Sequence, residues 1–265
     1  MADTAGGGRM TPEVERELLS RRWFYRFALP DGRTTPCALP PDVEPIHETR
    51  RAMIFGLLDR LYAGRWSEVE AADLACHQGW YTQHLAARGC RRVVGVDIRS
   101  GNVDDATFIA GVLGRTNVGF RVGDVTRLEP TDLGSFDVVL LLGLLYHLEN
   151  PIAAARLARA VTRGVCIVET QVVPNLTGVT DWGTSRLTKR FMGSFAVVDE
   201  AHDAASGVRE ANVSTISLVP SLEALTYILG AVGFSRVEVV PPPEGAYDQL
   251  ALGKRVVVAA FAQPD

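Results

Sequence analysis

The chain has 265 residues, 47% hydrophobic and 22% charged, a balance typical of a globular protein with a sizeable core. The formal net charge of −4 argues against a protein that binds nucleic acid through many phosphate contacts. The four cysteines show no zinc-like or CxxC spacing, the N-terminus lacks the apolar stretch of a signal peptide, and the longest apolar run is too short for a membrane span. We therefore expect a cytoplasmic protein that is not inserted in a membrane.

The first 65 residues predict an appendage to the main domain. A helix is expected from Pro12, which follows a capping threonine, and a Pro-Asp-Gly turn then favours a hairpin. A proline-rich link leads to a second helix, roughly His47–Tyr62. We assign residues 1–65 to an N-terminal tail, hairpin and helical appendage, and residues 66–265 to the main domain.

From Val69 onward the chain alternates apolar strands with helices. Strands this uniformly apolar imply a parallel sheet covered on both faces, and right-handed crossovers make it a doubly wound, Rossmann-like α/β sheet. The expected strands are residues 69–76, 91–98, 118–125, 136–145, 164–172, 235–240 and 254–261, with helices over 79–88, 105–113, 152–161 and 221–231.

Residues 172–213 interrupt this alternation. An irregular stretch of this length is usually a lid or a substrate-binding insertion, with plain surface loop as the alternative. Aromatic side chains here and near the N-terminus would wall an apolar substrate pocket, unless they are ordinary core. They are Trp23, Tyr25, Trp182, Phe191 and Phe195.

Polar residues follow several of the expected strands, where ligands of open parallel sheets bind. Asp97 ends the second strand, and a carboxylate there accepts hydrogen bonds from ribose hydroxyls, although a lone Asp at a strand end is more often a helix cap. Asp124 follows the third strand in a Gly-Asp turn. These positions predict a nucleotide-containing ligand without identifying it.

Two segments carry a family resemblance. DLACHQGW (residues 73–80) and GLLYHLENP (residues 143–151) resemble class I methyltransferases that use S-adenosylmethionine (SAM). Within that class they are similar to the bacterial tRNA wobble-uridine carboxymethyltransferases and their small-molecule relatives. Ala75 and His77 replace the first two glycines of the family pattern D-x-G-x-G-x-G, and Gly79 keeps the third. The resemblance covers about residues 69–240.

The resemblance implies SAM as cofactor, S-adenosylhomocysteine (SAH) as product, and a mostly parallel seven-stranded sheet ending in an antiparallel pair. It places the loop at Gly79 against the methionine part of SAM, Asp97 at the ribose, Asp124 at the adenine and Gly143 near the sulfonium. The implied cofactor contacts are Asp73, Ala75, His77, Gly79, Trp80, Asp97, Ile98, Asp124, Val125, Leu142 and Gly143. Tyr146 and His147 would face the reaction centre, or else pack structurally.

Glu169 and Gln171 share one face of the fifth strand. A carboxylate inside an apolar strand is costly unless it is paired or functional. Glu169 is therefore a candidate catalytic base, with a structural pairing to an arginine as the alternative, and Gln171 is a candidate substrate contact.

These observations predict methyl transfer to the carbon or oxygen of a small molecule of specialised metabolism. One version is a prenyl diphosphate, with Glu169 as base and arginines such as Arg50 at the diphosphate; only that substrate would bring Mg²⁺, since no metal site is expected. The alternatives are a tRNA wobble-uridine (carboxy)methyltransferase and an inactive SAM-binding protein. Nucleic acid is disfavoured by the charge, and a homo-oligomer stays open.

Overall fold

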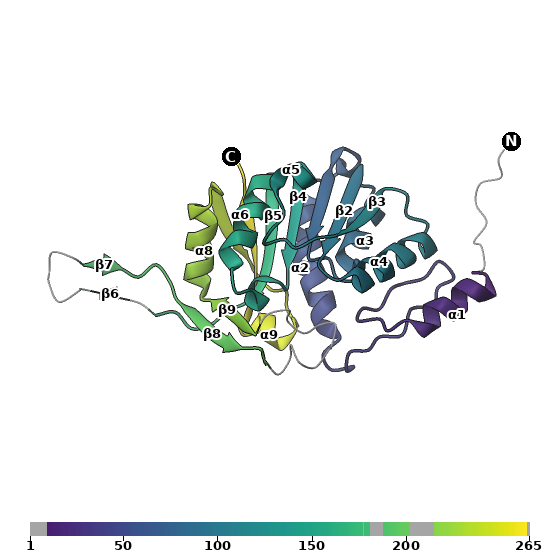
Figure 1. The fold of residues 1–265 in the computed structure, drawn as a ribbon, viewed down its shortest axis with the longest axis horizontal. Coiled ribbons are helices and arrows are strands. Elements are labelled where there is room, and N and C mark those ends of the chain that lie inside the picture. Colours follow the sequence, from purple (N-terminus) through teal and green to yellow (C-terminus); the bar gives the residue numbers. More distant parts are fainter. Residues whose placement is uncertain (1–9, 177, 181–187, 202–214, 264–265) are drawn as a thin grey trace.

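A seven-stranded sheet forms the centre of the molecule (Figure 1). The computed structural model describes residues 10–176, 178–180, 188–201 and 215–263. The strand order is β10-β11-β5-β4-β1-β2-β3. These strands are β1 (Glu70–Leu74), β2 (Arg92–Asp97), β3 (Val118–Val122), β4 (Phe136–Leu142), β5 (Thr162–Gln171), β10 (Arg236–Val240) and β11 (Arg255–Phe261).

The pairing confirms the expected mostly parallel, Rossmann-like sheet. Strands β3, β2, β1, β4 and β5 pair in parallel, whereas β11 runs antiparallel to both β5 and β10. The chain reverses its direction of winding between β1 and β4, and ligands of such sheets bind beyond the carboxyl ends of the strands at this point.

Helices cover both faces because nearly every residue of the central strands is apolar and buried. One face packs against α2 (Pro45–Leu61), α3 (Trp80–Ala87) and α4 (Ser100–Val112), and the other against α6 (Pro151–Val161) and α8 (Leu222–Ala231). The shorter helices are α1 (Pro12–Ser20), α5 (Pro130–Leu133), α9 (Asp248–Ala251), η1 (Trp66–Glu68) and η2 (Leu145–His147). None of the helices in the described ranges is both long and apolar enough to cross a membrane.

The N-terminal segment follows the prediction only in part. The side chain of Thr11 caps α1, and α2 lies where the second helix was expected. The hairpin is reduced to a single antiparallel bridge between Ala28 and Thr34. Trp23 is 1% exposed and its indole donates to the Leu18 carbonyl, so it belongs to the core.

The insertion after β5 is more regular than its sequence suggested. Strand β6 (Val179–Thr180) pairs with β7 (Lys189–Arg190), and β8 (Phe195–Asp199) pairs with β9 (Ile216–Pro220), both antiparallel. Figure 1 shows β6 and β7 lying well away from the central sheet, beyond β8 and α8.

The close fit between β2 and β3 gives a prediction about stability. A Cβ added at Gly95 would stand 2.5 Å from the Phe120 ring and 3.0 Å from the Cys76 sulfur, whereas one at Gly119 meets nothing within 4 Å. We expect Gly95→Ala to lower the free energy of unfolding by about 1–3 kcal/mol, as overpacking does, and Gly119→Ala to change it little. Urea titrations of both variants measure this, and equal stabilities would contradict the packing described here.

Candidate functional site

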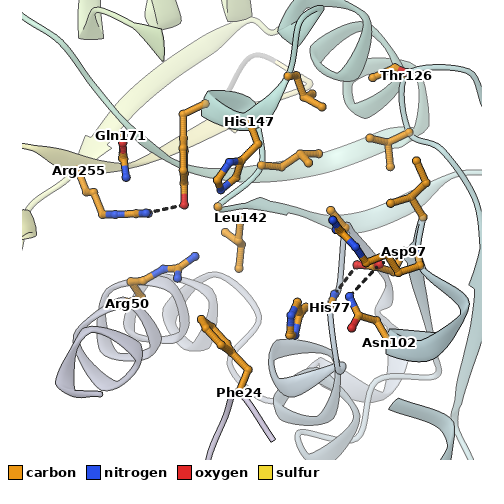
Figure 2. A pocket seen from close by; sticks show the side chains of 18 of the residues that line it. Phe24, Arg50, His77, Asp97, Asn102, Thr126, Leu142, His147, Gln171 and Arg255 are labelled. Carbon is orange, nitrogen blue, oxygen red and sulfur yellow. Dashed lines mark hydrogen bonds between the residues drawn. The ribbon is translucent and has the colours of Figure 1, made fainter. Parts of the chain in front are cut away.

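A cavity of about 860 Å³ opens at the carboxyl ends of the parallel strands. Figure 2 shows two ends to it: Asp97 and Asn102 lie at one, and Arg50, Gln171 and Arg255 at the other, with Leu142 between them. The sheet therefore brings together residues far apart in the sequence at the edge where a ligand was expected.

The loop after β1 keeps the backbone of a glycine-rich turn without two of its glycines. Ala75, His77 and Gly79 all have left-handed φ values, 65°, 51° and 76°. Outside glycine this conformation costs roughly 1–2 kcal/mol per residue. Gly79 has a second constraint, because a Cβ there would stand 2.8 Å from the Phe120 ring.

Asp97 holds this loop from the end of β2. One carboxylate oxygen accepts the His77 amide N–H at 2.8 Å, and the other accepts the Arg99 amide N–H at 2.9 Å and the Asn102 side chain at 3.1 Å. The residue is 6% exposed and lines the cavity. Its carboxylate thus both fixes the backbone of the loop and faces the cavity.

Eight of the eleven predicted cofactor contacts line the cavity, namely Ala75, His77, Asp97, Ile98, Asp124, Val125, Leu142 and Gly143. The adenine contact predicted for Asp124 stays a prediction, and one of its oxygens already accepts the Thr126 amide and hydroxyl.

The other three predicted contacts, Asp73, Gly79 and Trp80, are not among the residues that line the cavity, and their contact with the cofactor stays a prediction. Asp73 is 2% exposed and accepts the Thr82 hydroxyl at 2.6 Å. Trp80 stacks on Tyr25, with 5.5 Å between ring centroids.

The appendage supplies one side of the cavity. Phe24, Tyr25, His47 and Arg50 come from it and line the cavity. Gln78, 1% exposed within the loop after β1, anchors this segment: its side chain accepts the Phe24 amide at 2.7 Å and donates to the Arg22 carbonyl at 2.8 Å and to Asp105 at 2.9 Å. The loop and the appendage therefore form one unit.

A buried cluster of charges closes the far end. Glu169 is 0% exposed and sits between two guanidinium groups, each 2.7 Å away: Arg50 on one carboxylate oxygen and Arg255 on the other. Arg255 also donates to the Tyr146 hydroxyl at 2.5 Å and to the Gln249 side chain at 2.9 Å.

This cluster corrects the role expected for Glu169. Its side chain does not line the cavity, and both carboxylate oxygens face arginines. A carboxylate held in this way compensates buried positive charge and is not placed to take a proton from a substrate. The alternative of a structural ion pair is the one that the structure supports.

Some of the residues predicted to contact the substrate line the cavity and others do not. Those that line it are Tyr25, Tyr146, His147 and Gln171. Phe195 begins β8 and Phe191 directly follows β7; both are partly exposed and neither is among the residues that line the cavity, so their substrate contact stays a prediction. Trp23 is core, and Trp182 lies outside the described residues.

The arginines near the N-terminus do not gather at one site that could bind a diphosphate. Arg21 pairs with Asp105, Arg26 with Glu44 and Arg51 with Glu48, and of these N-terminal arginines and Arg50 only Arg50 lines the cavity. The described residues also contain no group of three or more His, Cys, Asp or Glu side chains that could hold a metal ion.

Sequence reasoning missed several cavity residues, among them His47, Asn102, Gln249 and Arg255. Arg255 left one signal: an arginine opens an apolar strand, as Glu169 stands within another, and opposite charges on two buried strands favour pairing. For His47 nothing in the helix pattern marks the side chain as facing a cavity.

Comparisons with known proteins agree with this geometry. Residues 71–164 match the family described as "Methyltransferase domain". The chain is 27% identical over 177 residues to a tRNA U34 carboxymethyltransferase of Alteromonas mediterranea, covering 63% of this chain and 45% of the relative. It is 32% identical over 105 residues to the enzyme of the same name from Desulfotalea psychrophila, covering 39% and 32%. The chain thus spans less than half the length of these relatives.

Solved structures show the same fold. The N-terminal domain of EvdMO1, crystallised in the presence of SAH and D-fucose, is 24% identical with a TM-score of 0.69, over 98% of this chain and 100% of that one. Magnesium protoporphyrin IX methyltransferase from Synechocystis PCC 6803 with bound SAH is 18% identical with a TM-score of 0.54, over 86% and 90%.

The buried charge cluster predicts that neutralising Glu169 strongly lowers the stability of the fold. Glu169→Gln keeps the shape of the side chain but leaves Arg50 and Arg255 buried without a counter-charge. Breaking a buried ion pair in this way costs about 3–5 kcal/mol, so we expect a loss of about that size in urea unfolding. An unchanged unfolding midpoint would show that the two arginines do not depend on this carboxylate.

Asp73 predicts a pH dependence of stability. Burial raises the pKa of its carboxyl to about 7, against the hydrogen bond from Thr82. Because the folded pKa lies above the unfolded value of about 3.9, the folded state binds more protons, and this group's contribution to stability falls as pH rises from about 4 to about 7.

Asp73→Asn removes that titration and keeps an oxygen for Thr82. We expect the stability of Asp73→Asn relative to wild type to rise between pH 4 and 7 and then level off, in urea titrations across that range. The exposed Asp104→Asn serves as control. A difference that stays flat with pH would contradict the raised pKa.

Proposed function

We propose that this class I SAM-dependent methyltransferase transfers the methyl group of SAM to a hydroxyl group of a small, polyhydroxylated molecule, with a sugar as the leading candidate. The observation that carries the proposal is the two-ended cavity. Asp97 lies at the end that fits a nucleoside, and Arg50 and Arg255 lie at a separate polar end, where Arg255 donates a hydrogen bond to Tyr146. Methyl transfer needs two ligands to meet between such ends.

The residues at the Asp97 end fit the adenosyl part of SAM. Three hydrogen bonds occupy three of roughly four lone-pair directions of the Asp97 carboxylate, so a ribose hydroxyl takes the remaining direction or replaces the 3.1 Å bond from Asn102. Ile98 and Val125 offer apolar surface to an adenine ring.

The middle of the cavity allows close approach to the reacting atoms. A Cβ at Gly143, where φ is 65°, would stand 3.2 Å from the Arg50 guanidinium and would narrow the passage between the two ends. Bound SAM would supply an electrophilic methyl group on its sulfonium: the substrate oxygen would bond to the methyl carbon as the carbon–sulfur bond breaks, SAH would leave, and the hydroxyl proton would pass to water at the mouth of the cavity. The contribution of the chain is to position the two ligands and to exclude water, which can supply much of the rate of such a displacement.

The polar end supports a small hydroxylated substrate. The side chains of Gln171 and His147 join Arg50 and Arg255 there, and the appendage closes the wall opposite. The EvdMO1 domain, crystallised with SAH and D-fucose, covers nearly the whole of this chain, appendage included. A prenyl diphosphate is less well served, because most candidate arginines are paired elsewhere.

A tRNA wobble-uridine (carboxy)methyltransferase is the second candidate, favoured by the names of the two curated relatives. The net charge of −4 weighs against it. Binding to tRNA that weakens steeply with salt would favour this candidate.

Calorimetry tests the cofactor part. We expect SAH to bind and NAD not to, and Asp97→Ala to weaken SAH binding about tenfold or more, equivalent to about 1.4 kcal/mol. Asp132→Ala, which alters a helix cap outside the cavity, is the control. Unchanged SAH affinity in Asp97→Ala would refute the ribose assignment.

Transfer of labelled methyl from SAM tests the substrate part. We expect incorporation into members of a panel of hexoses and deoxyhexoses, and none into tRNA. Methylated or carboxymethylated tRNA would favour the second candidate, and SAH binding without any methylated product would favour an inactive SAM-binding protein.

A further inference from the structure

His47 is a buried imidazole in the wall of the cavity. It lies in the first turn of α2, three residues before Arg50, and is 5% exposed. Three aromatic rings surround it, with centroid distances of 4.6 Å to Tyr25, 5.4 Å to Phe24 and 6.0 Å to Trp80. The residue belongs to the appendage and lies outside the segment that matches the methyltransferase family.

Both ring nitrogens of His47 lack a hydrogen-bond partner among the described residues. Leaving a buried polar group unsatisfied costs about 1–3 kcal/mol. A phenylalanine would pack against the same three rings without that cost. The described part of the chain therefore gives no reason for an imidazole at this position, and a bound ligand would supply the missing partner.

The surroundings keep this imidazole uncharged. Burial lowers the pKa of His47 to about 3, and the nearby charges of Arg50, His77 and Arg255 act in the same direction. A neutral imidazole presents one donor nitrogen and one acceptor nitrogen. Arg50 and Arg255, the charged groups of the cavity's polar end, present donors only.

We propose that His47 binds a hydroxyl group of the methyl-accepting substrate, an inference that rests on the function proposed above. A hydroxyl both donates and accepts, so it can donate to the free imidazole nitrogen while accepting from a guanidinium. A carboxylate or phosphate oxygen without a proton could use the arginines but not the imidazole acceptor. Such an oxygen could still accept from the imidazole N–H, but the acceptor nitrogen would stay unpaired, so the two ring nitrogens together favour a hydroxyl group at this position.

The aromatic neighbours complete such a site. Phe24 and Tyr25 also line the cavity, so a substrate hydroxyl at His47 lies beside apolar ring surface. The C–H face of a sugar ring offers apolar surface next to its hydroxyls, which matches this combination. In this arrangement the appendage determines substrate specificity and the parallel strands hold the cofactor.

The test uses D-fucose as probe, titrated by calorimetry into the full chain saturated with SAH. We expect His47→Phe to weaken D-fucose binding at least tenfold, to leave SAH affinity within about twofold, and to leave the thermal midpoint unchanged or raised. His47→Gln, which restores a donor and an acceptor, should recover most of the affinity.

His84 provides a matched control. Its ring packs against Trp80 and Phe55, with centroid distances of 4.4 and 5.5 Å, and burial lowers its pKa to about 3 as well, but it does not line the cavity. His84→Phe should leave D-fucose binding unchanged. In wild-type protein, the ring ¹⁵N signals of His47 should shift when D-fucose is added, and those of His84 should not.

The inference is overturned if His47→Phe binds D-fucose as wild type does, if no D-fucose binding is found in SAH-saturated wild type, or if the His47 signals do not move. The wild-type spectra give this answer even if His47→Phe fails to fold. Failure of SAH to bind would instead refute the proposed function itself, which keeps the two failures distinct.

Discussion

The carboxylate of Asp97 is the point on which the geometry of the cavity depends. It is nearly buried, and it ties the loop after β1 to the start of α4 through the His77 amide, the Arg99 amide and the Asn102 side chain. Each such charge-assisted hydrogen bond is stronger than a neutral one. Together they stabilise a loop in which Ala75 and His77 adopt a conformation that favours glycine. The ligand-binding edge of the sheet is thus preformed.

The second constraint joins the appendage to that loop. Gln78 makes its hydrogen bonds to Phe24, Arg22 and Asp105, so the segment before α2 cannot move away without exposing buried polar groups. The buried pairing of Glu169 with Arg50 and Arg255 does the same at the other end, because it links α2 to β5 and β11. The cavity is therefore shared between the parallel strands of the main domain and the N-terminal appendage.

Much of the core could be predicted from the sequence because its signals are local. The strands are uniformly apolar and are separated by capped helices, as in β4 and α6, and the motif residues Asp97 and Gly143 fall at strand ends. The family resemblance indicated which residues at the carboxyl ends of the strands would form a common site. Most of these residues line the cavity.

The remaining site residues depend on tertiary packing that no local pattern records. Trp23 and Tyr25 are two aromatic residues of one segment, yet one is core and the other lines the cavity. Glu169 was rightly identified as unusual, but only the positions of Arg50 and Arg255 show that it is a counter-charge. Phe191 and Phe195 lie on an insertion that leads away from the sheet.

A crystal structure of the chain with SAH would show whether the cofactor lies at Asp97. We expect ribose hydroxyls within hydrogen-bonding distance of the Asp97 carboxylate, the sulfur beside Gly143, and open space between that sulfur and His47. SAH bound elsewhere, or Asp97 turned away from the ribose while His77 fills the cavity, would contradict it.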